Sequence, residues 1–190
     1  MNEQQIIAAC VQGESWACKE IYETYAPTMM SLCIRYVGNK ETARDLLQDG
    51  FIKVFTYIHT YSNKGAFAGW IYRIFVTTAL EHLRKTDALK SAADITDYSQ
   101  QLKDVDVSVL DQLSADELME CVKELPTGYR TVFNLYVIEG YSHQEIANML
   151  GISVTTSKTQ FLRARYALQK RIQLLTQNEH VRQQKIKRLG

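Results

Sequence analysis

Residues that interrupt helices are scarce in this sequence. Only two prolines and nine glycines occur among its 190 residues, and both residue types disfavour helix interiors. No stretch shows clean alternation of apolar and polar residues between turns, so no sheet is expected. Hydrophobic residues make up 46% of the chain, which is enough to build packed cores and excludes a wholly disordered chain. We therefore predict an all-α fold.

Signals for a membrane span, an exported chain or a metal site are also missing. No run of about 20 apolar residues is present, as a membrane-spanning helix would need. The first residues lack the basic start and apolar stretch of a secretory signal, so we expect a cytoplasmic protein. The cysteines form no CxxC pair and, with the histidines, match no zinc spacing. We expect free buried thiols, no metal and no cofactor. The cysteines are Cys10, Cys18, Cys33 and Cys121.

Catalytic motifs are absent as well. The sequence contains no GxSxG, no HExxH, no Walker loop and no glycine-rich phosphate cradle after a strand. Its four histidines are scattered, and His143, which lies inside a predicted capping box, is expected to face solvent. We therefore do not expect an enzyme.

Charges of the two signs nearly cancel, with 22 basic and 21 acidic residues, but they are unevenly distributed. Residues 1–86 carry nine basic and eight acidic side chains, residues 87–117 carry two and eight, and residues 118–190 carry eleven and five. An acidic, polar segment of this kind favours a linker over a core. We predict a first domain at 1–86, an acidic linker at 87–113, a second domain at 114–176 and a basic tail at 177–190.

Five helices are predicted in the first domain. Apolar residues indicate one helix over 6–11 and a second over 16–25, and Pro27 opens a third that Gly38-Asn39 closes. Asn39 caps a fourth helix, and the fifth runs from Phe67 to about Lys85. The fourth helix has a broad apolar stripe made of Ala43, Leu46, Leu47, Phe51, Val54, Phe55 and Ile58.

Helix boundaries are marked more clearly in the second domain. Ser114 and Glu117 fit a capping box, Leu125-Pro126 ends the helix that it opens, and the next helix runs to Glu139-Gly140. A second capping box, at residues 142–145, opens a short helix that ends at Leu150.

We predict a helix-turn-helix that begins at this second capping box. Gly151 supplies a left-handed turn, and Ser153 caps a final helix that extends to about Leu175. Ser157, Phe161 and Ala164 are expected to pack inward. The opposite face offers Thr155, Thr156, Lys158, Thr159, Gln160, Leu162, Arg163 and Tyr166.

These side chains suit phosphates and base edges in a major groove. From Ser153 onward the chain has nine basic residues and one acid, so we expect salt-sensitive DNA binding, with Lys158, Thr159, Leu162 and Arg163 nearest the bases. A helical hairpin with a solvated basic face is the alternative.

The motifs resemble those of a known family. ELPTGYRTVFNLY at 124–136, EGYS at 139–142, EIA at 145–147, LGIS at 150–153, Thr156, Lys158 and RAR at 163–165 resemble region four of the extracytoplasmic-function (ECF) sigma factors of the sigma-70 family. Upstream, ARDLLQDGFIKVF at 43–55, Phe67, WIYRI at 70–74 and LRK at 83–85 resemble region two.

The resemblance implies that the fourth helix binds core RNA polymerase. The residues it implies are Asp45, Leu46, Gln48, Asp49, Phe51, Ile52 and Lys53. Core packing is the alternative for Leu46, Phe51 and Ile52, so Asp45, Gln48 and Asp49 are the better candidates.

The resemblance also implies that the fifth helix and the loop before it recognise a −10 promoter element. The residues are Tyr61, Lys64, Phe67, Trp70, Arg73, Thr77, Arg84 and Lys85. Aromatic faces and cations suit an unpaired strand. Core packing is an alternative for Trp70, and Arg84 and Lys85 could instead complement the helix C-terminus.

On this resemblance the protein is expected to be a sigma factor that binds core RNA polymerase and the −35 and −10 elements and is controlled by an anti-sigma factor. The linker could mimic nascent RNA or act as a spacer.

The sequence also departs from the family pattern. Thr77 and Glu81 stand where the family usually has Asn and Asp, and Gly50 should weaken its helix by about 1 kcal/mol. A DNA-binding regulator that never contacts polymerase is the rival interpretation.

Overall fold

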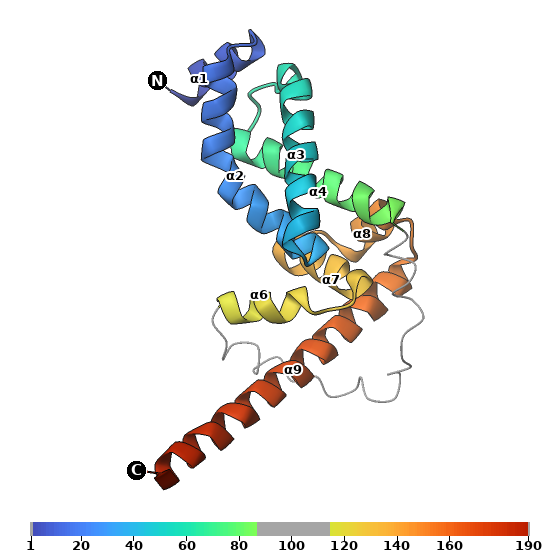
Figure 1. Ribbon diagram of the computed structural model, residues 1–190. Coiled ribbons are helices and arrows are strands. Elements are labelled where there is room, and N and C mark those ends of the chain that lie inside the picture. The colour runs from blue at the N-terminus through green and yellow to red at the C-terminus, as the bar shows by residue number, and fades with distance from the viewer. Residues whose placement is uncertain (1, 87–114, 190) are drawn as a thin grey trace. The chain divides into compact units, whose positions relative to one another are not determined.

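The computed structural model describes residues 2–86 and 115–189, which belong to two compact units, Met1–Asp87 and Ala88–Gly190 (Figure 1). Every regular element in the described residues is helical, which confirms the all-α prediction. The acidic linker predicted at 87–113 lies outside the described residues, as does Ser114 of the first predicted capping box in the second domain.

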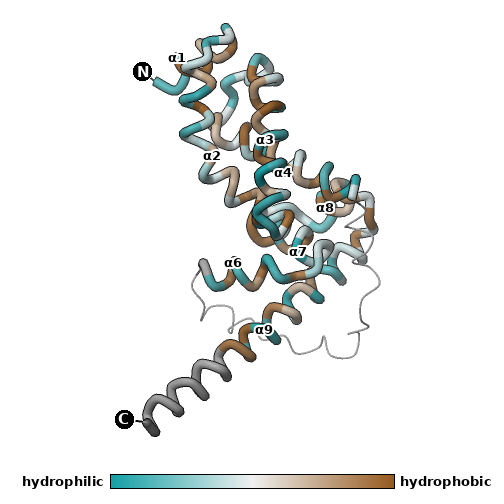
Figure 2. Tube along the Cα trace, viewed as in Figure 1, coloured by the Kyte–Doolittle hydropathy of each residue, from teal (hydrophilic) through white to brown (hydrophobic). Residues whose placement is uncertain are grey.

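The first unit is built from α1 (Glu3–Val11), α2 (Ser15–Val37), α3 (Lys40–Tyr57), a 3-10 turn η1 (Ile58–Thr60) and α4 (Phe67–Lys85). α2 packs on α1 and α3, and α4 crosses both α2 and α3 (Figure 1). Tyr36, Phe67 and Phe75 are the largest fully buried side chains of this core. Along α4, apolar residues are interspersed with polar ones (Figure 2), and the buried residues recur at helical spacing, as expected of a helix that buries one face.

Pro27 does not separate two helices, so the predicted break is wrong. α2 continues from Ser15 to Val37 with Pro27 inside it. Pro27 itself is exposed, whereas Ile21 before it and Met29 after it are buried. Packing of both halves against neighbouring helices therefore outweighs the hydrogen bond that proline cannot donate.

The predicted caps between α2 and α3 are confirmed. Gly38 has φ 80°, and its N–H donates to the Ile34 carbonyl over 2.8 Å. The Asn39 side chain accepts a hydrogen bond from the Thr42 N–H at 2.8 Å. Together they end one helix and begin the next within two residues.

The second unit contains α6 (Ala115–Lys123), α7 (Thr127–Phe133), a π-turn η3 (Asn134–Ile138), α8 (His143–Leu150) and α9 (Val154–Leu189). Its core joins α6 and α7 to α9 through Val122, Phe133 and Leu168. Buried Arg130 donates to the carbonyls of Lys123 and Leu125 at 2.8 and 3.1 Å, which fixes the turn between α6 and α7.

α9 is longer than predicted. It continues past Leu175 to Leu189 (Figure 1), so residues 177–189, predicted as a basic tail, belong to this helix. The first part of the helix packs on the core, where Ala164, Leu168 and Ile172 are buried.

Candidate functional site

The α8–α9 segment has the predicted helix-turn-helix geometry. The Ser142 N–H donates to Glu145 Oε2 at 2.8 Å, and the Glu145 N–H donates to Ser142 Oγ at 3.3 Å, which completes the capping box. The hydrogen bonds that the Ser142 N–H and the Ser142 hydroxyl donate to the Glu145 carboxylate lower the pKa of Glu145. Gly151 has φ 67°, as a left-handed cap requires. Ser153 Oγ then accepts from the Thr156 N–H at 2.9 Å and caps α9.

The face of α9 that was predicted to meet DNA is mostly accessible. Thr155, Lys158 and Leu162 are exposed, and the partly exposed positions on this face are Thr156, Thr159, Arg163 and Tyr166. Gln160 is the exception, with only 7% of its surface exposed. It lies four residues before buried Ala164 on the packing stripe of α9, so its assignment to the DNA face is wrong.

His143, the first residue of α8, packs against η3 and α9, so the prediction that it faces solvent is wrong. Its ring stacks on Tyr136 with centroids 4.4 Å apart, and its Nδ1 lies 2.9 Å from Ser157 Oγ. Partial burial and the nearby Lys158 ammonium lower the pKa of His143. The ring therefore helps to set α8 against the first turn of α9.

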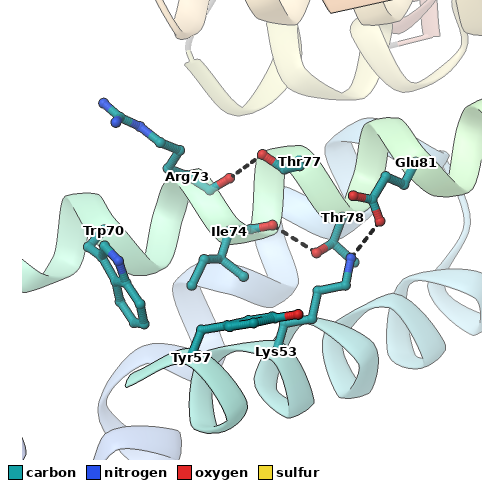
Figure 3. Close-up of a pocket in the computed structure, with 8 residues that line it drawn as sticks. All are labelled: Lys53, Tyr57, Trp70, Arg73, Ile74, Thr77, Thr78 and Glu81. Carbon is teal, nitrogen blue, oxygen red and sulfur yellow. Dashed lines mark hydrogen bonds and ion pairs between the residues drawn. The ribbon is translucent and has the colours of Figure 1, made fainter. Parts of the chain in front are cut away.

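A groove between α3 and α4 collects aromatic and basic side chains in the first unit (Figure 3). It has a volume of about 490 Å³. In Figure 3 Trp70 lies at one end and Lys53 pairs with Glu81 at the other, with Nζ 2.6 Å from Oε2, while the ring of Tyr57 lies between them. The lining residues are Lys53, Tyr57, Trp70, Arg73, Ile74, Thr77, Thr78 and Glu81.

Of the residues predicted for the −10 element, Trp70, Arg73 and Thr77 line this groove. The exposed members of the predicted set are Lys64, Arg73, Thr77, Arg84 and Lys85, while Tyr61 and Trp70 are partly buried. Phe67 is only 1% exposed, so its predicted contact with DNA is wrong. Its ring belongs to the core and supports Trp70, with centroids 5.7 Å apart and planes 13° from parallel.

Tyr57 was not anticipated from the sequence. It is 52% exposed and lines the groove beside Trp70. Its position in the helix is the signal that could have predicted its role. Tyr57 falls outside the apolar stripe of its helix, so core packing does not explain an aromatic residue there.

A second groove, of about 620 Å³, lies between α2 and α3. Of the residues predicted to bind polymerase, Asp45, Gln48, Asp49 and Ile52 are exposed, and Ile52 has 55% of its surface accessible. Gln48 and Ile52 line this groove. The other lining residues are Tyr22, Met30, Arg44, Leu47, Phe51 and Phe55.

Two predicted polymerase contacts are corrected by this geometry. Leu46 and Phe51 are 1% and 3% exposed, so core packing, the alternative interpretation, applies to both. Lys53 is partly exposed and pairs with Glu81 of α4 in the other groove, so its polymerase contact stays a prediction. Helix periodicity explains the split, because Leu46 and Phe51 lie on the inward stripe while Ile52 is turned about 100° from Phe51.

Two family models match the chain in sequence order. "Sigma-70 region 2" matches residues 21–88, and "Sigma-70, region 4" matches residues 115–168. The ECF RNA polymerase sigma factor SigW of Bacillus subtilis is 32% identical over 172 residues, which span 85% of this chain and 91% of SigW. The chain belongs to the ECF sigma factors.

Other similar proteins carry related names. The RNA polymerase sigma-H factor of Pseudomonas aeruginosa is 27% identical to this ECF sigma factor over 185 residues, which span 92% of this chain and 95% of the relative. A solved structure of the sigma factor RpoE with the anti-sigma factor NepR, from Bartonella quintana, aligns with a TM-score of 0.47 and 19% identity, and covers 80% of this chain and 94% of that one.

The described part of this sigma factor offers neither a candidate membrane helix nor a cluster of metal ligands. None of its helices there is long and apolar enough to cross a membrane. Nor do any three His, Cys, Asp or Glu side chains in that part gather as metal ligands would.

Proposed function

We propose that this ECF sigma factor binds core RNA polymerase in the cytoplasm, directs it to promoters with −35 and −10 elements and promotes transcription initiation without catalysis of its own. The observation that carries the proposal is the presence of region 2 and region 4 in one chain, each with an accessible surface of suitable chemistry. A regulator that binds only duplex DNA would not need the aromatic groove between α3 and α4.

The −35 element is assigned to the exposed face of α9. Lys158 and Thr155 lie in the first two turns, where a recognition helix contacts base edges and phosphates. The caps at Ser142, Gly151 and Ser153 hold this helix at a defined angle to α8. The basic residues of α9 add a sequence-independent attraction for phosphates.

The −10 element is assigned to the groove between α3 and α4 and to the loop before α4. Tyr57 and Trp70 present aromatic surface on which an unpaired base can stack. Exposed Arg73 and Lys64 supply positive charge for the backbone of a single strand. The Thr77 hydroxyl, which donates to the Arg73 carbonyl at 2.9 Å, keeps lone pairs for a base edge.

Core polymerase is assigned to the outer face of α3 and the groove between α2 and α3. Exposed Ile52 supplies an apolar anchor, and exposed Asp45, Gln48 and Asp49 surround it with polar groups. A central apolar contact within a polar rim is typical of protein interfaces. We propose that an anti-sigma factor covers this same surface.

Run-off transcription tests the proposal directly. Core polymerase is incubated with genomic fragments from the source organism, with and without the purified chain. New discrete start sites that share two upstream elements are expected. Duplex binding without polymerase association and without new starts would overturn the proposal in favour of a DNA-binding regulator.

A further inference from the structure

Two thiols meet at the corner between α1 and α2. The Sγ atoms of Cys10 and Cys18 lie 2.8 Å apart in a thiol–thiol contact. Cys10 is buried at the end of α1, and Cys18 is partly exposed in the first turn of α2. The other two cysteines, Cys33 and Cys121, are buried elsewhere, in the second half of α2 and in α6.

Backbone hydrogen bonds hold this corner in place. The Gly13 N–H donates to the Cys10 carbonyl at 2.9 Å, and the Glu14 N–H donates to the Ala9 carbonyl at 3.1 Å. Gly13 has φ 84°, which turns the chain sharply between the helices. The Cys18 N–H then donates to the Glu14 carbonyl in the first turn of α2. The fold, and not a chance rotamer, therefore brings the two cysteines together.

We propose that Cys10 and Cys18 form a reversible redox modification site, which closes to an intramolecular disulfide in the presence of a hydroperoxide. The Cys18 sulfur attacks the peroxide, the O–O bond breaks, and Cys18 sulfenic acid and water (or an alcohol) result. The Cys10 sulfur then attacks the sulfenic sulfur, and the S–S bond forms as water leaves with the Cys10 proton. Both thiols are oxidised, and one peroxide is reduced.

The surroundings of the two sulfurs fix the order of these steps. Cys18 is the accessible partner, so peroxide reaches its sulfur first. Burial and the neighbouring Cys18 raise the pKa of Cys10 to about 12, which keeps it protonated until the second step. Contact between the sulfurs then supplies the high effective concentration that the closure needs. A disulfide of about 2.0 Å requires only a small approach from the present separation.

The cross-link would join α1 covalently to α2. In the reduced protein, α1 is also held by the Tyr25 hydroxyl, which donates to Glu3 Oε1 at 2.8 Å. Cys18 lies one helical turn before Tyr22, which lines the groove between α2 and α3. Oxidation would therefore fix the end of α2 that borders this groove and should raise the thermal stability of the first unit.

The test uses the purified full chain with hydrogen peroxide, followed by alkylation of the remaining thiols and mass spectrometry of its peptides. We expect a linkage between Cys10 and Cys18 in the monomer, with a loss of two hydrogens, while Cys33 and Cys121 remain alkylated as internal controls. Dithiothreitol should reverse the linkage and lower the unfolding midpoint to that of the reduced protein.

A matched variant, Cys18→Ser, removes the accessible thiol and leaves the buried ones. In this variant Cys10 should be as slow to react with peroxide as Cys33, and no linkage should form. The proposal is overturned if wild-type Cys10 and Cys18 stay fully alkylatable, if Cys18 is oxidised to the sulfinic acid without closing, or if the linkages join two chains.

Discussion

Gly50 of α3 lies directly against the ring of Phe75 of α4. A Cβ added to Gly50 would stand 2.3 Å from Phe75 Cε1, which no real contact allows. The ring of Phe75 also meets Phe51 edge-on, with centroids 5.2 Å apart. The sequence showed only the local cost of a glycine inside a helix. The structure shows what it permits, which is the close approach of α3 and α4 at this point.

Gly50→Ala is expected to destabilise the protein. The helix gains roughly 1 kcal/mol in propensity, but the new methyl group must push Phe75 out of a packed core, which typically costs about 1–3 kcal/mol or more. The midpoint of urea unfolding measures the net effect. Gly69→Ala is the matched control, because Gly69 is exposed in α4 with nothing near its missing Cβ, and this variant should be slightly stabilised. Equal stabilisation of both variants would contradict the packing described here.

Arg163→Ala is expected to weaken binding to a duplex that contains the −35 element. A bidentate contact between an arginine and a base is worth about 1–3 kcal/mol, and fluorescence anisotropy against that duplex gives the affinity. Arg171→Ala removes the same charge further along α9, where Arg171 pairs with Glu124 at 3.0 Å on the surface, and it should change affinity little. Equal losses in both variants would indicate charge alone, without base recognition by Arg163.

Tyr57→Ala is expected to impair promoter opening while it leaves duplex binding through the second unit intact. Stacking of one base on an aromatic ring is worth about 1–3 kcal/mol, so binding of the unpaired −10 strand by holoenzyme should fall roughly 5- to 150-fold. Tyr57 is half exposed, so stability should barely change. Trp16→Ala, an exposed aromatic residue of α2 outside the groove, is the control. An equal loss of −10 strand binding in both variants would show that the groove does not recognise the −10 element.

Ile52→Asp is expected to weaken binding of core polymerase by at least about tenfold, because it places a charge at the centre of the proposed apolar contact. Since Ile52 is mostly exposed, unfolding should be almost unaffected. Leu46→Ala provides the contrast: Leu46 is buried, so its truncation should cost about 2–5 kcal/mol of stability. Polymerase binding by titration and unfolding by denaturant separate the two effects, and unaltered binding by Ile52→Asp would remove this face of α3 from the interface.

Local signals in the sequence were sufficient for the ends of several helices. The caps at Asn39, Ser142 and Gly151 were predicted and are present, because each depends on hydrogen bonds or backbone angles within a few residues. The same is true of Ser153, whose hydroxyl caps α9. The exposed basic face of α9 follows from residue type and helical spacing, so most of the proposed −35 surface could also be predicted from the sequence.

The orientation of individual side chains was less predictable. An apolar residue beside a polar stripe can face the core or a partner, and only the packing of α3 against α2 and α4 separates buried Leu46 and Phe51 from exposed Ile52. Gln160 was placed on the wrong face because its polarity outweighed its spacing from Ala164. Phe67 was assigned to DNA by its residue type, although its neighbours enclose it.

The sequence by itself determined the all-α fold, most of the helix ends and the family, because these depend on composition, short-range hydrogen bonding and motifs that are contiguous in the chain. The tertiary structure decided that α2 continues through Pro27, that Gly50 admits Phe75, that Tyr57 and Trp70 border one groove and that two cysteines touch. These features require contacts between residues from different helices or from either side of a turn. Such contacts are set by how whole helices pack, and no local pattern of residues encodes them.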